Sequence, residues 1–504
     1  MNKRSLAVAL LLIAVLLVGG AMAQEAKPAA PPTPSGAKEF VTHHSITIGK
    51  EPLAYAAVVG ETIVPDRDGA PEADFYSIAY IKEGADRDAR PLTFLFNGGP
   101  GSSSAWLHLG AFGPRRLALP NEPVIPGAPP YPLVDNQETL LRFSDLVFVD
   151  PIGTGYSRAL GKKADRDYWG VDEDGEVIAK FIRVYLTANR RWNSPKYLAG
   201  ESYGTIRACM LVRDLELSAL EGLNLNGVVL ISAACDPRTF MTAGPGNELP
   251  WVTNLPTYAA TGFYHKTLPQ QPADLGGFLR QVEDFASSEY LAALFKGDAL
   301  PPAGQEAIAQ KLHQFTGLSV DYLKRAHLRI DQERFRKELL RDRGLVMGVY
   351  DTRYTGKDFD EAGETVQLDP FALGIAGPFV AGLNSYLSAE LNVRMDRPYV
   401  VFSSDAARSW KRAGDTTFVF AGYLNTVPDL VQAAATNRDF RVFVASGLYD
   451  LTTAYYGTQY VFDQSGIAKD RLTLKVYAGG HMMYTVPSSL QLLAADIGAF
   501  MNRK

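Results

Sequence analysis

Hydrophobic and polar residues alternate along two stretches near the start of the chain, residues 43–64 and 73–83. An alternation of period two is typical of a β-strand with one buried face. We therefore expect antiparallel strands there, with the ordered fold beginning near Val41.

Six later runs are short and almost entirely apolar, and each ends in glycine or small polar residues. They are PLTFLFNGGPG, SDLVFVDPIGTGYS, KYLAGESYGT, LNGVVLISAA, FRVFVASGLYD and RLTLKVYAGGHMM. Apolar runs of this length fit parallel strands that are covered on both faces, with polar residues at their carboxyl ends.

Segments with the period of a helix lie between several of these runs, for example Asp172–Asn189 and Thr205–Leu220. An alternating order of strands and helices predicts an α/β fold with a mostly parallel central sheet and helices on both faces.

About two hundred residues with helix-like and loop-like patterns separate Ala234 from Phe440. The simplest interpretation is a mainly helical cap inserted into the sheet domain. The charges of residues 321–344 are expected to form a solvated helix face. The expected organisation is a first core part, a cap and a second core part, at residues 41–236, 237–435 and 436–504.

The N-terminus has the pattern of a signal peptide. Lys3 and Arg4 precede an apolar run over residues 6–18, and Ala21-Met22-Ala23 supplies small residues at the positions that a signal peptidase reads. An uncleaved membrane anchor is the alternative, but the run is short for a span and ends in two glycines. We expect residues 1–23 to be cleaved after Ala23, which predicts a periplasmic or secreted protein.

Residues 24–40 are rich in proline and alanine and predict a flexible tether. Of the whole chain, 46% is hydrophobic and 21% charged, which is an ordinary globular composition. Loss of Lys3 and Arg4 changes the formal net charge from −5 to −7. Bulk charge therefore argues against nucleic acid or an anionic membrane surface as a partner, and stable membrane insertion is not expected after cleavage. A diffusible substrate is expected.

Cys209 and Cys235 are the only cysteines. Two are too few for a disulfide-stapled scaffold, and their spacing is not that of metal ligands. A single bridge is possible, although two buried free thiols are favoured. No motif indicates a metal or another cofactor, and the oligomeric state stays open.

Gly200-Glu201-Ser202-Tyr203-Gly204 satisfies the G-x-S-x-G pattern between a predicted strand and a predicted helix. Small residues on either side allow a tight turn that exposes the serine hydroxyl. Ser202 is therefore the candidate nucleophile. The alternative is a glycine-bounded turn with an incidental serine.

A serine nucleophile needs a base and a carboxylate that orients the base, and in hydrolases of this chain order both follow the serine. Of the seven histidines, only His481 follows the last core strands. Asp450 lies just past the preceding strand, and the competing acids Asp429, Asp439 and Asp463 lie in helix-like or turn contexts.

The oxyanion of an acyl-transfer reaction needs two aimed donors. The backbone N–H of Tyr203, directly after the nucleophile, is one candidate. The other is the N–H of Gly99 in FNGGPGSSS, because a residue without a side chain lets the substrate approach.

The motifs NGGPGSSS, DPIGTGYS, GESYGT, SGLYD and GGHM, in this order, resemble the serine carboxypeptidase family of α/β-hydrolases. The cap segments YDTRYTG and DPFALGIAGPFVAGLNSYL resemble a bacterial branch of it. The resemblance implies the triad Ser202, Asp450 and His481 and an oxyanion hole at Gly99 and Tyr203.

The resemblance further implies that Asn97, the Gly98 amide and Glu201 bind the terminal carboxylate of a peptide, so that peptides with a free C-terminus are the expected substrates. The family usually has a second glutamate at the position of Ala111. An esterase or acyltransferase with the same triad is therefore the alternative function, and a non-catalytic binding protein is the third. Glu201 can bind a carboxylate only if it is protonated, which burial favours.

Overall fold

The structure is a computed structural model that describes residues 38–218, 222–241, 246–411 and 424–503. The predicted signal peptide and most of the predicted tether lie outside the described residues. The fold begins with a strand at Glu39, two residues before the expected start. The described residues belong to one compact unit.

The central sheet has the order β1-β2-β3-β7-β4-β9-β10-β13-β14, with the short β8 paired to β3. Its strands are β1 Glu39–Ile48, β2 Glu51–Pro65, β3 Pro71–Lys82, β4 Leu92–Phe96, β7 Asp145–Val149, β8 Arg158–Ala159, β9 Lys196–Glu201, β10 Gly227–Ile231, β13 Arg441–Gly447 and β14 Leu472–Tyr477.

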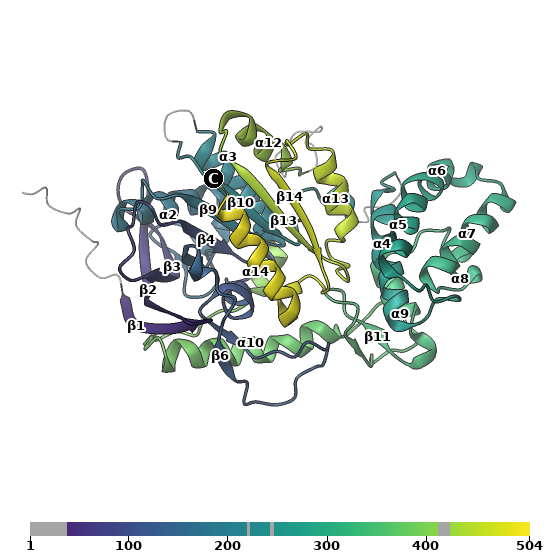
Figure 1. The fold of residues 1–504 in the computed structure, drawn as a ribbon, viewed down its shortest axis with the longest axis horizontal. Helices are drawn as coiled ribbons and strands as arrows, with labels where there is room; N and C mark the ends of the chain where they lie inside the picture. The colour runs from purple at the N-terminus through teal and green to yellow at the C-terminus, as the bar shows by residue number, and fades with distance from the viewer. Residues whose placement is uncertain (1–37, 219–221, 242–245, 412–423, 504) are drawn as a thin grey trace, which may run out of the picture. The chain divides into compact units, whose positions relative to one another are not determined.

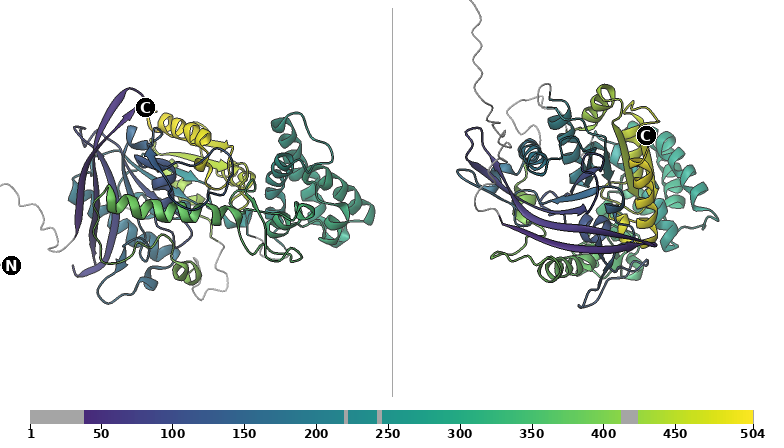
Figure 2. Two further views of the ribbon diagram at one scale, coloured as in Figure 1. Left: turned by 90° about the horizontal axis from the view of Figure 1, so that it is seen from below. Right: turned by 60° about the vertical axis from the view of Figure 1, so that its left-hand side comes forward.

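The strands from β7 to β14 are parallel, whereas β1, β2 and β3 pair antiparallel at one edge, and β3 joins β7 antiparallel. Figure 2 shows the long antiparallel strands running together along this edge. All six apolar runs form the expected strands, and both alternating stretches form the expected antiparallel ones. The predicted α/β class with a mostly parallel sheet is thus confirmed.

Two apolar layers enclose the sheet. Along β10, Val229 and Ile231 face one core cluster, while Val228 and Leu230 face the other. The alternation follows from the pleat of a strand. It explains why apolar residues point to both faces of this strand.

Different helices cover the two faces. The helices α10 and α14 contribute to the cluster around Ile231, and α2, α3 and α12 contribute to the cluster around Leu230. Figure 1 shows α14 crossing in front of the central strands. The larger helices are α2 Val171–Asn189, α3 Tyr203–Glu216, α4 Leu249–His265, α5 Leu275–Phe285, α6 Leu291–Lys296, α7 Pro302–Thr316, α8 Val320–Arg325, α9 Gln332–Glu338, α10 Pro370–Ala389, α11 Ser404–Ser409, α12 Val427–Thr436, α13 Tyr455–Asp463 and α14 Pro487–Met501.

The remaining elements are short. They are α1 Ala105–Leu107, the π-helices His108–Phe112 and Ala286–Tyr290, the strand pairs β5 Arg115–Leu117 with β6 Leu133–Asp135 and β11 Val346–Met347 with β12 Thr355–Gly356, and the 3₁₀ turns Leu140–Arg142, Asp165–Tyr168, Pro237–Thr239, Gly297–Ala299, Arg341–Arg343 and Met483–Thr485.

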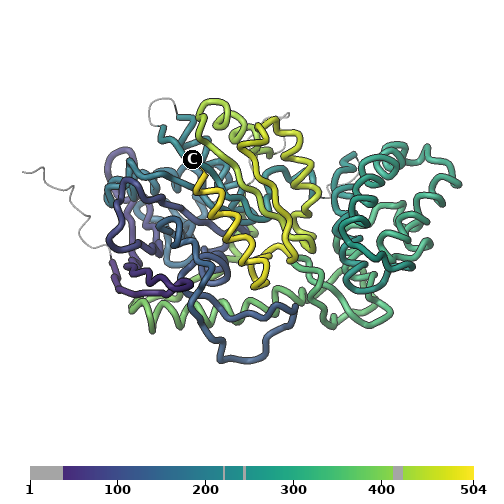
Figure 3. The backbone as a smooth tube through the Cα atoms, in the orientation of Figure 1, coloured from purple at the N-terminus to yellow at the C-terminus, as the bar shows by residue number. Residues whose placement is uncertain are grey.

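The chain leaves the sheet after β10, builds helices, and returns at β13, as the trace in Figure 3 shows. Helices α4 to α9 surround an apolar cluster of their own, which also includes Tyr449 and Leu451 from the loop after β13. By contrast, α10 and α12 pack on the sheet. Of the described residues, α10 alone is long and apolar enough to span a membrane, and half of that stretch is buried in the fold, as in a core helix.

The expected helix Thr205–Leu220 begins two residues earlier and ends at Glu216. The Glu216 carboxylate accepts hydrogen bonds from the Leu225 N–H and the Asn437 amide. Cys209 and Cys235 are buried free thiols whose Sγ atoms lie 3.5 Å apart.

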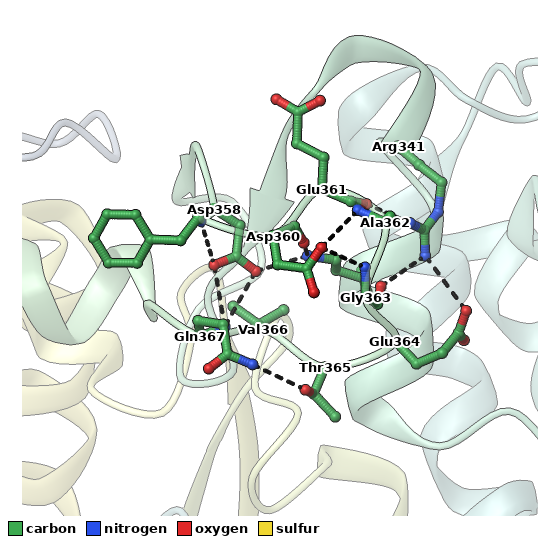
Figure 4. A network of polar contacts seen from close by, with 12 residues as sticks. Arg341, Asp358, Asp360, Glu361, Ala362, Gly363, Glu364, Thr365, Val366 and Gln367 are labelled. Carbon is green, nitrogen blue, oxygen red and sulfur yellow. Dashed lines mark hydrogen bonds and ion pairs between the residues drawn. The ribbon is translucent and has the colours of Figure 1, made fainter.

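The expected solvated helix face at residues 321–344 holds for most of its charges but differs from the structure in two respects. Two short helices replace one, because His327 and Leu328 adopt left-handed backbone conformations, with φ of 51° and 64°. In addition, the Lys337 ammonium is buried and lies 2.7 Å from an Asp358 carboxylate oxygen. Figure 4 shows the loop from Asp358 to Gln367. The Gln367 N–H donates to both oxygens of the Asp358 carboxylate and holds it in place.

Candidate active site

The loops after β4 and β9 meet at the carboxyl edge of the sheet. Phe96 pairs with Gly200 where the two strands end. A methyl group on Gly98 would lie 2.5 Å from the backbone nitrogen of Tyr203 and 2.7 Å from the carbonyl oxygen of Glu201. From β4 the chain crosses to β7 on one side and then to β9 on the other, and such a reversal is where open α/β sheets bind ligands.

Ser202 occupies the turn between β9 and α3 with φ 57° and ψ −126°. This conformation is unusual for a residue with a side chain and is typical of a nucleophile elbow. A side chain on Gly200 would collide with the Gly204 carbonyl, and one on Gly204 would lie 2.5 Å from the Phe96 carbonyl oxygen. The Ser202 N–H donates to the Ile231 carbonyl at 2.9 Å. The two glycines and this bond fix the turn, and Ser202 stays partly exposed.

Asp450 and His481 are joined by a hydrogen bond of 2.8 Å between Oδ2 and Nδ1. The Thr453 hydroxyl donates to the same carboxylate oxygen at 2.7 Å. The other oxygen accepts the N–H groups of Thr452 and Thr453 at 2.7 and 3.1 Å. Asp450 is completely buried. The carboxylate is thus fixed, and it orients the imidazole so that Nε2 lies on the side of the ring opposite Asp450.

The histidine loop is held from two sides. The Ser232 hydroxyl donates to the His481 carbonyl at 2.7 Å, and the His481 N–H donates to the Tyr350 carbonyl at 2.5 Å. The Tyr350 and His481 rings lie 5.4 Å apart. A side chain on Gly480 would collide with the Tyr350 carbonyl, which explains the glycine before the histidine. The sequence marked the segment YDTRYTG only as a family likeness and gave no sign of this contact.

His481 Nε2 is buried and makes no hydrogen bond to a described residue. The structure therefore forms the Asp450–His481 contact but no hydrogen bond between Nε2 and the Ser202 hydroxyl. Burial lowers the pKa of His481, but the charge of Asp450, its hydrogen bond and the charge of Glu201 outweigh burial and raise the pKa above its ordinary 6.5.

The competing acids lie elsewhere. Asp429 is in the first turn of α12, Asp463 is the last residue of α13, and Asp439 precedes β13. Of the four candidate aspartates, Asp450 is the one that hydrogen-bonds His481.

Three backbone N–H groups around the turn donate no hydrogen bond within the part of the chain that the structure describes. They belong to Gly98, Gly99 and Tyr203. Gly99 has φ 103°, a left-handed conformation that suits glycine. Unpaired N–H groups beside a nucleophile are suited to stabilising an oxyanion or a carboxylate.

Glu201 is 4% exposed and lies beside Asn97, which is fully buried. The Asn97 amide donates to Glu201 Oε2 at 3.0 Å, and its own oxygen accepts the Leu107 N–H at 2.9 Å. Burial raises the pKa of Glu201 to about 7, although the charge of His481 and the hydrogen bonds from Tyr484 and Asn97 oppose the rise. A carboxyl group with this pKa is largely uncharged in mildly acidic solution.

Tyr484 was not predicted from the sequence. Its hydroxyl donates a short hydrogen bond to Glu201 Oε2. Tyr484 lies three residues after His481, in GGHMMYT, and its ring contacts the segment where the family glutamate is missing. A methyl group on Gly110 would lie 2.8 Å from its Cε2 atom. Ala111 is buried in the adjoining π-helix.

Among the described residues, no group of three or more His, Cys, Asp or Glu side chains is arranged to hold a metal ion.

The parallel sheet, the strained serine turn, and the acid and histidine that follow β13 and β14 define a serine hydrolase of the α/β-hydrolase fold. Residues 70–245 match the model of the serine carboxypeptidase family, as the motifs predicted. None of the curated proteins compared with this chain matches it.

Three of the solved structures that match this chain are as follows. A peroxisomal alpha-beta-hydrolase, Lpx1, from Saccharomyces cerevisiae has 10% identity over 92% of this chain and 89% of its own, with a TM-score of 0.31. An esterase from Pyrococcus furiosus has 10% identity over 88% and 91%, with a TM-score of 0.35. A haloalkane dehalogenase variant from Bradyrhizobium elkanii has 11% identity over 92% and 97%, with a TM-score of 0.29.

Proposed function

We propose that the protein is a secreted serine carboxypeptidase that releases C-terminal residues from peptides. The observation that carries this proposal is Glu201, a buried acid with its pKa raised to about 7, directly beside Ser202. An ionised acid there would repel the terminal carboxylate of a peptide. A neutral acid donates a hydrogen bond to it, together with Asn97 and the free N–H of Gly98.

Acylation begins when His481 Nε2 takes the proton of the Ser202 hydroxyl as Oγ attacks the last peptide carbonyl. The N–H groups of Gly99 and Tyr203 stabilise the oxyanion, and Asp450 stabilises the imidazolium. His481 then gives its proton to the leaving nitrogen, and the C–N bond breaks. Water then attacks the acyl-enzyme while His481 takes its proton. His481 gives this proton to Ser202 Oγ as the ester bond breaks and the shortened peptide leaves.

An esterase or acyltransferase is the second candidate, because Ala111 stands where the family has a carboxylate-binding partner. A non-catalytic binding protein is the least favoured function, because all three triad residues are present. Secretion rests on the N-terminal pattern, and N-terminal sequencing of the exported protein should begin at Gln24.

Two experiments test the proposal. A fluorophosphonate probe should label the wild type on Ser202 and fail on Ser202→Ala, and a folded wild type that resists labelling would contradict both enzyme functions. N-blocked dipeptides and N-blocked amino-acid esters then separate the candidates. Hydrolysis of the esters with no cleavage of the dipeptides would favour the esterase.

A further inference from the structure

Glu201 receives both of its hydrogen bonds on one oxygen. The Tyr484 hydroxyl and the Asn97 amide nitrogen both donate to Oε2. The other oxygen, Oε1, accepts no hydrogen bond from the described residues. The amide orientation of Asn97 is fixed because its Oδ1 accepts the Leu107 N–H at 2.9 Å.

An oxygen that already accepts two donors is a poor position for a proton of its own. When Glu201 is neutral, its proton is therefore placed on Oε1. Tyr484 is 1% exposed and its pKa is raised well above 10, because burial and the charge of Glu201 disfavour the phenolate. Its hydroxyl thus remains a donor.

We infer that Tyr484 is a positioning residue that fixes the Glu201 proton on Oε1 and so aims a single hydrogen-bond donor at the terminal carboxylate of the substrate. This inference rests on the proposed function. Tyr484 contacts Glu201 and not the reacting atoms, so it acts through the acid.

Small residues make room for the tyrosine. A methyl group on Gly110 would lie 2.8 Å from Tyr484 Cε2 and 3.0 Å from Phe379 Cζ. Ala111, the next residue, is fully buried. A partner from the histidine loop therefore replaces a partner from the segment after β4, which explains how this chain lacks the second glutamate and still holds Glu201.

A tyrosine partner in place of a glutamate alters the pH at which Glu201 ionises. A phenol donor stabilises the charged form of Glu201, so its hydrogen bond lowers the pKa of the acid. Tyr484→Phe should therefore raise the pKa of Glu201 by about one unit, the order expected for loss of one hydrogen bond to a charged group. Gly110→Ala should act in the same direction, because it displaces the ring.

The first test does not need activity. Infrared spectra of the wild type and of Tyr484→Phe are recorded against pH. From each, the spectrum of the same protein carrying Glu201→Gln is subtracted, so that the remaining protonated carboxyl band belongs to Glu201. The midpoint should rise by about one pH unit in Tyr484→Phe. An unchanged midpoint would overturn the inference, whatever the enzyme hydrolyses.

The second test uses kinetics. The falling limb of kcat/KM for an N-blocked dipeptide acid should move to higher pH in Tyr484→Phe and in Gly110→Ala. At low pH, KM should rise severalfold while kcat changes less, because the donor is no longer fixed. A falling limb that stays at the same pH would contradict a positioning role. So would a loss of kcat/KM that is equal at every pH.

The matched control is Tyr477→Phe. Tyr477 is also a buried tyrosine, and its hydroxyl donates to Asp496 at 2.8 Å, outside the site. This variant should leave both the infrared midpoint and the falling limb in place. A wild type that shows the infrared midpoint but cleaves no peptide would contradict the proposed function alone.

Discussion

Asp450 and His481 face each other at 2.8 Å in the buried space between the ends of β13 and β14. The carboxylate is held by Thr452 and Thr453, and the backbone of His481 is held by Ser232 and Tyr350. Both groups are therefore oriented before a substrate arrives, and this preorganisation accounts for much of the catalytic power expected of such a pair.

Asp450→Asn should lower kcat for ester hydrolysis by about a thousandfold or more, because the amide no longer holds the imidazole in the productive tautomer. The variant should remain folded, since the amide oxygen can still accept the Thr452 and Thr453 N–H groups. Asp439→Asn is the matched control, because Asp439 is exposed and lies outside the site. Similar losses in both variants would remove Asp450 from the triad.

Peptide acids and esters should show different pH profiles. Activity on both rises with pH as His481 loses its proton, with a pKa above 6.5. Binding of the peptide carboxylate requires neutral Glu201, so kcat/KM for peptide acids falls as pH increases through about 7. The acid profile is thus a narrow bell, whereas the ester profile has the rising limb only.

Glu201→Gln tests the origin of the falling limb, because glutamine keeps a donor and does not ionise. The falling limb for peptide acids should disappear from the profile of this variant. If the same limb persists, Glu201 does not bind the substrate carboxylate.

Asp150 should make the fold less stable as pH rises. Burial raises its pKa from 3.8 to about 7, although the Ser104 N–H and the Tyr399 hydroxyl donate to it. The folded state keeps a proton that the unfolded state releases, so this stabilisation is complete below about pH 4 and is lost as pH rises to about 7. The loss is of the order of 4 kcal/mol, at about 1.4 kcal/mol for each pKa unit.

Urea unfolding at pH 5 and pH 8 measures this effect. The difference in the free energy of unfolding between the two pH values should be smaller in Asp150→Asn than in the wild type. An equal difference in both proteins would show that Asp150 is ionised throughout, contrary to its burial.

Lys337 should matter more to stability than its position in a charged segment suggests. Lys337→Ala leaves the Asp358 carboxylate buried and unpaired, with an expected cost of about 3–5 kcal/mol in urea unfolding. Lys324→Ala, which removes an exposed pair with Glu306, should have a much smaller effect, because solvent screens that pair. Equal costs would mean that the Lys337 pair is solvated.

The sequence was most informative where contacts are local. The strands β4, β9 and β10 are mostly apolar because both faces of the sheet are covered there, and the two glycines around Ser202 predict its tight turn. The order of the motifs then placed Asp450 and His481 at adjacent strand ends.

Contacts between segments that are distant in the chain could not be predicted from the sequence. Tyr484 and Glu201 are 283 positions apart, and nothing in GGHMMYT indicates an acid partner. The burial of Lys337 depends on Asp358, which lies in the loop after β12. Local periodicity describes a face of a helix but not what packs against it.

The release of single C-terminal residues tests the central claim most directly. The wild type, with Ser202→Ala as control, would be incubated with an equal mixture of one peptide as its free acid and as its C-terminal amide, and the products read by mass spectrometry below pH 7. The account predicts that the acid is shortened one residue at a time, that the amide stays intact for longer, and that Ser202→Ala leaves both unchanged. Equal shortening of acid and amide, or cleavage at internal bonds, would contradict it.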